Sequence, residues 1–308
     1  MLIVWDGNNI FRRYLAAPRF ANLTDSKGRP SGGLYGTVST ILKHIDRWRP
    51  THCVVAFDGV NATATKQKVY SGYKANRAAN SLLGEDAEVS KLVHHSMSQT
   101  ELNQLLATTK LLDALGLKVY HNDELDADDI IGTVAKSGCA ERCLIVSNDK
   151  DFMQLLGGGV KQLRNDALIG PKEVKQQFGV NPDQIADFLA LSGDSVDGIP
   201  GLTNCGPKTA ASLLSQYGTI KGIAQSDSPW SVKLKAQKPD IMRFRKLTTI
   251  DTAVLSPKEI VGLKESAKPK PYKQPDLANM IAQYGLGTLA AWVGSHPSSL
   301  LDCKNELF

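Results

Sequence analysis

The opening segment MLIVWDGNN (residues 1–9) decides the fold. Residues 2–5 are apolar and rich in β-forming side chains, and Asp6 then begins a turn that leads into a helix-like stretch at residues 10–17. Because a charge at position 6 comes too early for a signal peptide, the segment predicts a first strand. Continuous apolar runs at residues 53–57 and 144–146 predict two more strands that are buried on both faces.

Strands and helices alternate through the first half of the chain. The further helices and strands that we predict there cover residues 34–48, 102–115, 117–120, 127–135 and 160–163. Such alternation is typical of a parallel, doubly wound α/β sheet, in which ligands bind outside the carboxyl ends of the strands. Asp6, Asp58 and Asp149 each follow a predicted strand, so we expect them to converge at one edge of the sheet.

The second half of the chain has a helical pattern. Its predicted helices cover residues 171–178, 182–191, 208–217 and, as the final helix, 276–284. An extended basic linker is predicted at residues 268–275. We therefore expect an α/β domain at residues 1–170, a helical subdomain at 171–292 and a tail at 293–308. Residues 60–97 lack periodicity and are too many for a plain loop, which predicts a functional or mobile segment.

The composition is that of an ordinary globular protein with a mildly basic balance. The 308 residues have a net charge of +5, and the five scattered cysteines indicate neither a disulfide framework nor a zinc site. No apolar run in the sequence approaches the roughly 20 residues of a membrane helix. We therefore expect a cytoplasmic protein with a polyanionic partner and no membrane contact.

Aspartates gather in a few short segments of the chain. Taken singly, each aspartate is more simply read as a helix N-cap or as part of a solvated helical face. Taken together, carboxylates at one sheet edge repel one another unless cations neutralise them. Oxygen ligands without His or Cys favour Mg²⁺ or Mn²⁺ over zinc, and none of the six histidines lies in these segments.

Six motifs resemble those of the 5′-nuclease superfamily. In order, they are VWDG (4–7), AFDG (56–59), YKANR (73–77), DADDIIG (126–132), SNDKDF (147–152) and GDSVDGIPG (193–201). The superfamily includes flap endonucleases, phage 5′ nucleases and the 5′→3′ exonuclease domain of bacterial DNA polymerase I. The resemblance extends from residue 2 to residue 292, and six motifs in the same order are highly specific.

The resemblance implies two divalent ions, Mg²⁺ or Mn²⁺, in a PIN-like parallel sheet. The residues implied around the first ion are Asp6, Asp58, Asp128 and Asp149. Those implied around the second ion are Asp151, Asp194 and Asp197, with Asp126 and Asp129 as outer supports. Asp126 stands where many relatives have Glu. Two such ions activate water and stabilise the leaving oxygen in phosphodiester hydrolysis.

Residues 198–210 are predicted to form a Gly-rich hairpin followed by a helix. Glycines such as Gly201 and Gly206 let backbone approach a phosphate, and Pro207 suits the first turn of a helix whose N–H groups point outward. A P-loop is the competing interpretation, but Pro207 precedes Lys208 and no buried strand leads into the loop. The resemblance implies a helix-hairpin-helix that binds duplex backbone, with Lys208 and Thr209 in contact and a bound K⁺.

Tyr73, Lys74 and Arg77 combine stacking faces with positive charge, which suits a nucleic-acid strand. On composition alone, a solvated amphipathic helix is equally consistent. The resemblance places this Lys and Arg at the catalytic site, at the base of a helical arch over the metals. The candidate arch at residues 78–97 contains one basic residue, Lys91. The last five residues, 304–308, faintly resemble peptides that dock on sliding clamps, although a frayed terminus is the simpler interpretation.

Three hypotheses for the function follow. The leading one is a free-standing, monomeric 5′→3′ exonuclease and flap endonuclease that acts in DNA replication or repair, in a bacterial or phage-infected cell. Its partner would be DNA with a 5′ single-stranded flap or end next to duplex. A PIN-like ribonuclease and a DNA-binding protein with a decayed metal site are the alternatives. The helical segment at residues 193–210 argues against the first alternative, and Asp151, Asp194 and Asp197 argue against the second.

Overall fold

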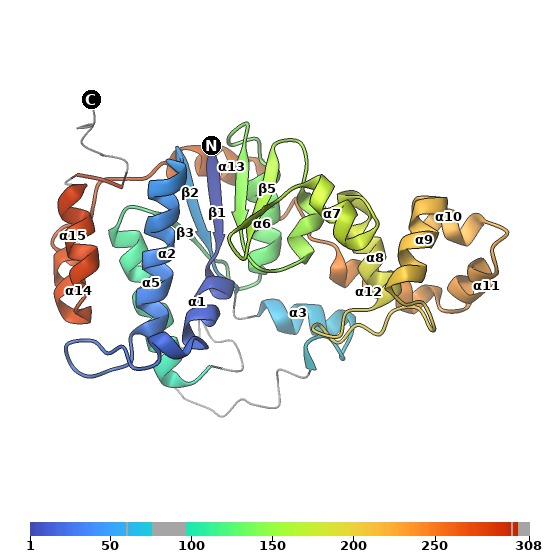
Figure 1. Ribbon diagram of the computed structural model, residues 1–308, viewed down its shortest axis with the longest axis horizontal. Coiled ribbons are helices and arrows are strands. Elements are labelled where there is room, and N and C mark those ends of the chain that lie inside the picture. The colour runs from blue at the N-terminus through green and yellow to red at the C-terminus, as the bar shows by residue number, and fades with distance from the viewer. Residues whose placement is uncertain (60, 76–96, 297, 301–308) are drawn as a thin grey trace.

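A six-stranded sheet forms the centre of the computed structural model, which describes residues 1–59, 61–75, 97–296 and 298–300 (Figure 1). Its strand order is β3-β2-β1-β4-β5-β6. The strands are β1 (Leu2–Asp6), β2 (His52–Ala56), β3 (Lys118–Tyr120), β4 (Cys143–Val146), β5 (Val160–Arg164) and β6 (Ala167–Ile169). The first five are parallel, and the short edge strand β6 is antiparallel to β5. The predicted doubly wound sheet is therefore confirmed, with β6 as an unpredicted addition.

Strand β1 is buried on both faces because helices cover both sides of the sheet. Successive side chains of a strand point to opposite faces. Leu2 and Val4 accordingly pack in one core cluster with α6 (Ala127–Lys136). Ile3 and Trp5 pack in another, under α1, α2 and α5. These three helices cover Gly7–Leu15, Gly32–Trp48 and Gln99–Ala114. Figure 1 shows α2 and α5 on one face and α6 on the other.

The direction of chain progression reverses between β1 and β4. Strands β2 and β3 extend the sheet on one side of β1, and β4, β5 and β6 extend it on the other. In open α/β sheets the crevice at such a switch point, outside the carboxyl ends of the strands, is where ligands bind. The ends of β1, β2 and β4 therefore mark the place where function is expected.

The helical part of the chain begins after β6. Its helices are α7 (Pro171–Phe178), α8 (Ile185–Ser192), α9 (Pro207–Tyr217), α10 (Ile220–Gln225), α11 (Pro229–Ala236), α12 (Lys238–Thr248) and α13 (Pro257–Ser266). The helices predicted at residues 171–178, 182–191 and 208–217 are confirmed, with a 3-10 turn at Pro182–Gln184 before α8. Helices α10 to α13 were not predicted. In Figure 1, α9, α10 and α11 lie at the end of the molecule opposite α14 and α15.

The two last helices return to the α/β part of the molecule. Helix α14 (Asp276–Tyr284) has the predicted bounds, but α15 (Gly287–Ser295) follows it, so the prediction that α14 is the final helix is wrong. Leu277 and Leu289 join the core cluster beneath α2 and α5. Trp292 Nε1 donates a hydrogen bond of 2.7 Å to Asp46 Oδ2 on α2. The two helices thus cover one side of the sheet domain.

Several predicted features fall on residues that are not described. The arch predicted at residues 78–97 lies outside the described residues apart from Met97, and the clamp-like tail at 304–308 lies wholly outside them. Helix α3 (Ala62–Val69) precedes the predicted arch. None of the described helices has the length and apolar character needed to cross a membrane.

Leu277→Ala should lower the free energy of unfolding by roughly 2–5 kcal/mol, because it opens a cavity at a fully buried position of α14. Urea unfolding of the whole chain measures this. Val261→Ala on α13, where the side chain is 67% exposed, is the control and should change stability by less than about 0.5 kcal/mol. Equal stability of the two variants would show that α14 does not belong to the core of the sheet domain.

Candidate active site

Acidic side chains gather at the carboxyl edge of β1, β2 and β4. Asp6 is the last residue of β1, and Asp58 and Asp149 follow β2 and β4 by two and three residues. Burial, together with the nearby carboxylates of Asp58 and Asp149, raises the pKa of Asp6 to about 7, against hydrogen bonds that favour its ionised form. The carboxylates of Asp58 and Asp149 therefore lie close enough to Asp6 to disfavour its ionised form.

Hydrogen bonds to neighbouring segments hold these carboxylates in place. Asp6 Oδ1 accepts from the Asn9 N–H at 2.9 Å and so caps α1, while Asp6 Oδ2 accepts from Ser147 Oγ at 2.7 Å. Asp58 Oδ1 accepts from the Ala127 N–H at 2.9 Å, at the start of α6. Asp6 therefore caps a helix, as the simpler interpretation of a single aspartate predicted, and also belongs to the acidic group.

Buried Gln162 on β5 supports the loop that carries Asp149. Its Nε2 donates to the carbonyl oxygens of Ser147 at 2.9 Å and Asp149 at 2.6 Å. Sequence analysis missed this residue. The strand VKQLR also contains Lys161 and Arg164, so no local signal in the sequence distinguished Gln162.

The N-cap and first turn of α6 add three aspartates with different electrostatic surroundings. Burial opposes ionisation of Asp126, but the ammonium groups of Lys66 and Lys74 outweigh it and hold the Asp126 pKa well below its usual range. Burial and the carboxylates of Asp126 and Asp149 raise the pKa of Asp128 well above its usual range. The pKa of Asp129 is also raised, chiefly by burial, and its Oδ1 accepts from the Asp251 N–H at 2.9 Å.

Lys66 is a site residue that sequence analysis missed. It lies on α3, and its Nζ forms an ion pair of 2.5 Å with Asp126 Oδ2. Both side chains are largely buried, at 18% and 9% exposure. A lysine in the aperiodic segment 60–97 gave no signal, because its partner lies 60 residues away in the sequence and only the tertiary fold brings the two together.

Tyr73 is only 1% exposed and packs in the core cluster beneath the sheet. The ring therefore has no face free for a base, and the expectation that Tyr73 stacks on DNA is wrong for this structure. Instead, the ammonium groups of Lys74 and Lys66 lie 4.9 and 5.9 Å from the centre of its ring. Arg77, expected beside Lys74, lies outside the described residues.

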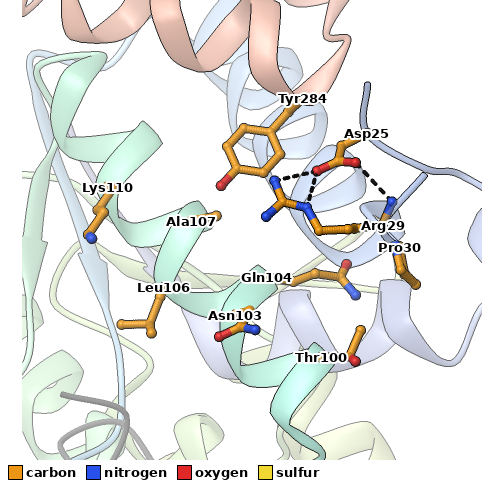
Figure 2. A pocket seen from close by; sticks show the side chains of 10 residues that line it. All are labelled: Asp25, Arg29, Pro30, Thr100, Asn103, Gln104, Leu106, Ala107, Lys110 and Tyr284. Atoms are coloured by element: carbon orange, nitrogen blue, oxygen red, sulfur yellow. Dashed lines mark hydrogen bonds and ion pairs between the residues drawn. The ribbon is translucent and has the colours of Figure 1, made fainter. Parts of the chain in front are cut away.

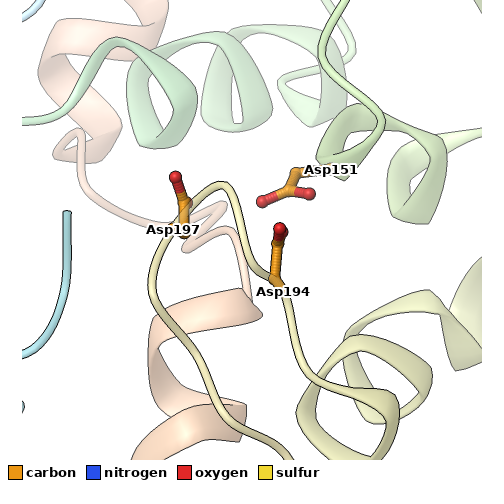
Figure 3. Close-up of side chains that lie close together, drawn as sticks. All are labelled: Asp151, Asp194 and Asp197. Atoms are coloured by element: carbon orange, nitrogen blue, oxygen red, sulfur yellow. The ribbon is translucent and has the colours of Figure 1, made fainter. Parts of the chain in front are cut away.

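A second acidic group is formed by Asp151, Asp194 and Asp197 (Figure 3). One carboxylate oxygen of each lies within 4.8 Å of those of the other two. Among the described residues, no other set of three His, Cys, Asp or Glu side chains meets this criterion. The acids implied around a first ion do not meet this criterion.

The loop between α8 and α9 carries two of these three acids. Asp194 and Ile199 exchange backbone hydrogen bonds of 2.8 Å, which closes a hairpin. Gly201 has a φ of 77°, and a Cβ there would clash with the backbone of Leu191 and Gly193. The hairpin therefore requires glycine at this position.

The same loop also contacts the segment that follows α3. The Lys74 N–H donates to the Asp197 carbonyl oxygen at 3.0 Å. Burial disfavours the Lys74 ammonium, but the carboxylates of Asp126 and Asp197 overcome this and raise its pKa. Lys74 therefore lies between the first acidic group and the second.

Lys150 lies within the second acidic group. Its Nζ is 2.6 Å from Asp194 Oδ2 and 3.8 Å from Asp151 Oδ1. Although burial acts in the opposite direction, these carboxylates raise the pKa of Lys150. Asp151 Oδ1 is buried and has no hydrogen-bond partner within the described parts of the chain. Burial and Asp149 raise the pKa of Asp151 well above its usual range.

Helix α9 begins directly after the hairpin. Gly206 is its N-cap residue, Pro207 occupies the first turn, and Lys208 is exposed there, while Thr209 is half-buried. A Cβ on Gly206 would meet nothing within 4 Å, so the space in front of this helix end is open. The predicted helix start, with Pro207 in the first turn, is therefore confirmed.

A separate cavity lies between α5, the loop before α2 and Tyr284 (Figure 2). Its volume is about 410 Å³, and none of its lining residues belongs to either acidic group. Asp25 and Arg29 at its wall are paired with each other at 2.7 Å. The cavity is therefore not part of the candidate active site.

Fold and site together define an α/β protein with a parallel sheet and acidic groups suited to metal ions beside the carboxyl ends of its strands. The chain belongs to the 5′-3′ exonuclease family. Residues 1–179 match the family's N-terminal resolvase-like domain, and residues 180–270 match its C-terminal SAM-fold domain.

Individual relatives agree with this assignment. A 5′-3′ exonuclease of Aquifex aeolicus is 29% identical over 282 residues, which cover 90% of this chain and 88% of the relative. DNA polymerase I of Mycobacterium leprae is 31% identical over 81% of this chain, and that of Deinococcus radiodurans is 34% identical over 75%. The matched regions make up only 27% and 22% of those two polymerases.

Solved structures share the fold. The zinc-bound 5′-exonuclease of T5 superposes with a TM-score of 0.67 at 17% identity, over 86% of this chain and 97% of that one. A complex of the bacteriophage T5 flap endonuclease with DNA and metal ions superposes with a TM-score of 0.64, also at 17% identity, over 91% and 96% of the two chains. At this level of identity, the likeness establishes the architecture.

Lys66→Gln should lower the free energy of unfolding in EDTA by roughly 3 kcal/mol, because it removes one partner of a largely buried ion pair. Chemical denaturation measures the change. Lys68→Gln is a matched control, since Lys68 lies on the same helix and is exposed. If Lys66→Gln were as stable as Lys68→Gln, the ion pair between Lys66 and Asp126 would not contribute to the stability of the fold.

Proposed function

We propose that this chain is a structure-specific 5′ nuclease, a 5′→3′ exonuclease and flap endonuclease that hydrolyses DNA with two metal ions. One observation supports this above all: the loop at residues 193–206 supplies Asp194 and Asp197 to the acidic group and leads directly into α9. An element suited to duplex backbone and a set of metal ligands are therefore parts of one continuous segment. Such a protein would cut at a fixed place relative to the duplex that it binds.

The residues present fit divalent cations. The second group offers only carboxylate oxygens, and one of them, Asp151 Oδ1, is buried without a hydrogen-bond partner among the described residues. Hard oxygen donors of this kind suit Mg²⁺ or Mn²⁺. The first ion would be held by Asp6, Asp58, Asp128 and Asp149, and the second by Asp151, Asp194 and Asp197. When bound, such ions lower the pKa of an attacking water and stabilise the leaving oxygen.

Asp126 and Asp129 would support the ligands from outside. The structure favours such a role for Asp126, because its carboxylate is committed to Lys66 at 2.5 Å. Asp129 likewise binds a backbone N–H of another segment at 2.9 Å. Both acids would thus orient α6, whose first turn also carries Asp128.

The DNA would extend from Lys74 to the hairpin. Lys74 lies beside both acidic groups, so it and Arg77 would hold the 5′ single strand over the metals. Gly201, Gly206, Lys208 and Thr209 would contact duplex backbone, with a K⁺ at the hairpin. A helix N-terminus with exposed N–H groups and a nearby lysine favours phosphate.

The wider biological setting is also part of the proposal. The polymerase relatives suggest a role in DNA replication or repair, and the T5 enzyme bound to DNA suggests a flap substrate. We propose a monomer that acts in the cytoplasm. Contact with a replication protein through the C-terminal tail would be an additional interaction.

A 5′-flap duplex should be cut near its branch while the matching 3′ flap survives. Cutting near the branch follows because Lys74 and the hairpin both lie next to the acids, and the 5′ polarity follows from membership of the 5′-3′ exonuclease family. Digestion of end-labelled 5′-flap, 3′-flap and nicked duplexes with and without Mg²⁺ measures this. An RNA flap of the same sequence tests the ribonuclease alternative.

The matched control is Asp149→Ala, which should lose several orders of magnitude in rate while DNA binding is largely retained. Efficient 3′-flap cleavage that is absent from this variant would show the polarity to be wrong. Cleavage within about tenfold of the parent would remove Asp149 from the metal site.

Lys208→Ala should reduce the slope of log K against log salt by about one, since one phosphate contact would be lost. Fluorescence anisotropy with labelled duplex in Ca²⁺ measures the slope. Lys264→Ala on α13 is the control, because α13 lies near the amino end of β2, whereas the acids lie at the carboxyl edge. The carbonyl of Ala267, directly after α13, accepts from the Cys53 N–H there. Equal slopes for the two variants would place Lys208 away from DNA.

A further inference from the structure

Lys150 stands in the chain between two aspartates of the site, Asp149 and Asp151. Its ammonium lies 2.6 Å from Asp194 Oδ2 and 3.8 Å from Asp151 Oδ1. Two of the three carboxylates proposed to hold the second ion therefore already have a cation next to them. The cation belongs to the chain itself.

The oxygens of Asp194 are both in use. Oδ2 accepts from Lys150, and Oδ1 accepts from the Val196 N–H at 3.1 Å within the hairpin. A divalent ion can gain Asp194 Oδ2 as a ligand only if the Lys150 ammonium moves away, because two cations at one oxygen repel each other. The side chain of Lys150 is 27% exposed and that of Asp194 only 4%, so the lysine can move toward solvent while the aspartate stays.

We propose that Lys150 is the resident counter-ion of the Asp151–Asp194–Asp197 group and competes with the second divalent ion for Asp194. This rests on the assignment of the second ion to these acids and adds a determinant of its affinity. One ammonium neutralises part of a group of three carboxylates, which keeps the hairpin docked near Asp151 when no metal is bound. The divalent ion consequently binds more weakly than it would to the same three carboxylates without the Lys150 ammonium.

The inference can be tested without DNA by titrating Mn²⁺ into the full chain and measuring binding by electron paramagnetic resonance. Lys150→Gln should bind one Mn²⁺ about tenfold more tightly than the parent, the scale of one charge-assisted hydrogen bond. Lys150→Arg keeps the charge and should bind as the parent does. Lys161→Gln, an exposed change on β5 with the same loss of charge, is the matched control and should have no effect.

Thermal unfolding supplies a second readout. In EDTA the Lys150→Gln protein should melt at a lower temperature than the parent, and saturating Mn²⁺ should raise its melting temperature by more. In an Asp194→Asn background, Lys150→Gln should no longer increase the affinity for Mn²⁺, because the carboxylate shared by the lysine and the metal is gone.

Equal or weaker Mn²⁺ binding by folded Lys150→Gln would overturn the proposal. So would a tenfold gain that persists in the Asp194→Asn background, or a gain of the same size in Lys161→Gln. None of these readouts requires cleavage. Failure of the proposed nuclease function would appear in the flap assay, whereas failure of this inference would appear in the metal titration.

Discussion

Repulsion among carboxylates at the carboxyl edge of the sheet is the constraint on which the rest of this structure depends. Two carboxylates about 5 Å apart repel by roughly 3 kcal/mol at an effective dielectric constant of 20. The structure shows two ways in which this repulsion is reduced. Asp6 and Asp128 have raised pKa values, so that they tend to keep a proton, whereas Asp126 and Asp194 are paired with Lys66 and Lys150. Under the proposed function, bound divalent cations would reduce the repulsion further.

The same carboxylates also hold the secondary structure in place. Asp6 caps α1, Asp58 binds the first N–H of α6, and Asp194 orders its hairpin through the Val196 N–H. Their positions are therefore fixed by hydrogen bonds before any ligand arrives, which lowers the cost of bringing like charges together when a cation binds. A substitution at any of them changes local structure as well as charge, so neutral and isosteric variants are the informative ones.

The sheet and its acids could be predicted from sequence because their signals are local. An apolar run followed directly by Asp identifies both a buried strand and the side chain at its end, as at Asp6 and Asp58. The lysine partners could not be predicted in this way, since Lys66 meets Asp126 only through the tertiary fold. The buried ring of Tyr73 was misjudged for a related reason: an aromatic residue beside a lysine does not reveal which way it faces. Helix α15 was missed because its apolar sequence shows no clear amphipathic period.

The loop at residues 193–206 couples the parts of the site through backbone rather than through flexible side chains. It supplies two acids to the second group, receives the Lys74 N–H at Asp197, and ends at the N-cap of α9. Positive φ angles at Gly193, Gly198 and Gly201 fix its course. The spacing between the acids, the segment that begins at Lys74 and the start of α9 is therefore set by one short stretch of chain. If DNA spans these elements as proposed, the distance from bound duplex to the cleaved bond follows from the fold of this loop, and no separate measuring element is required.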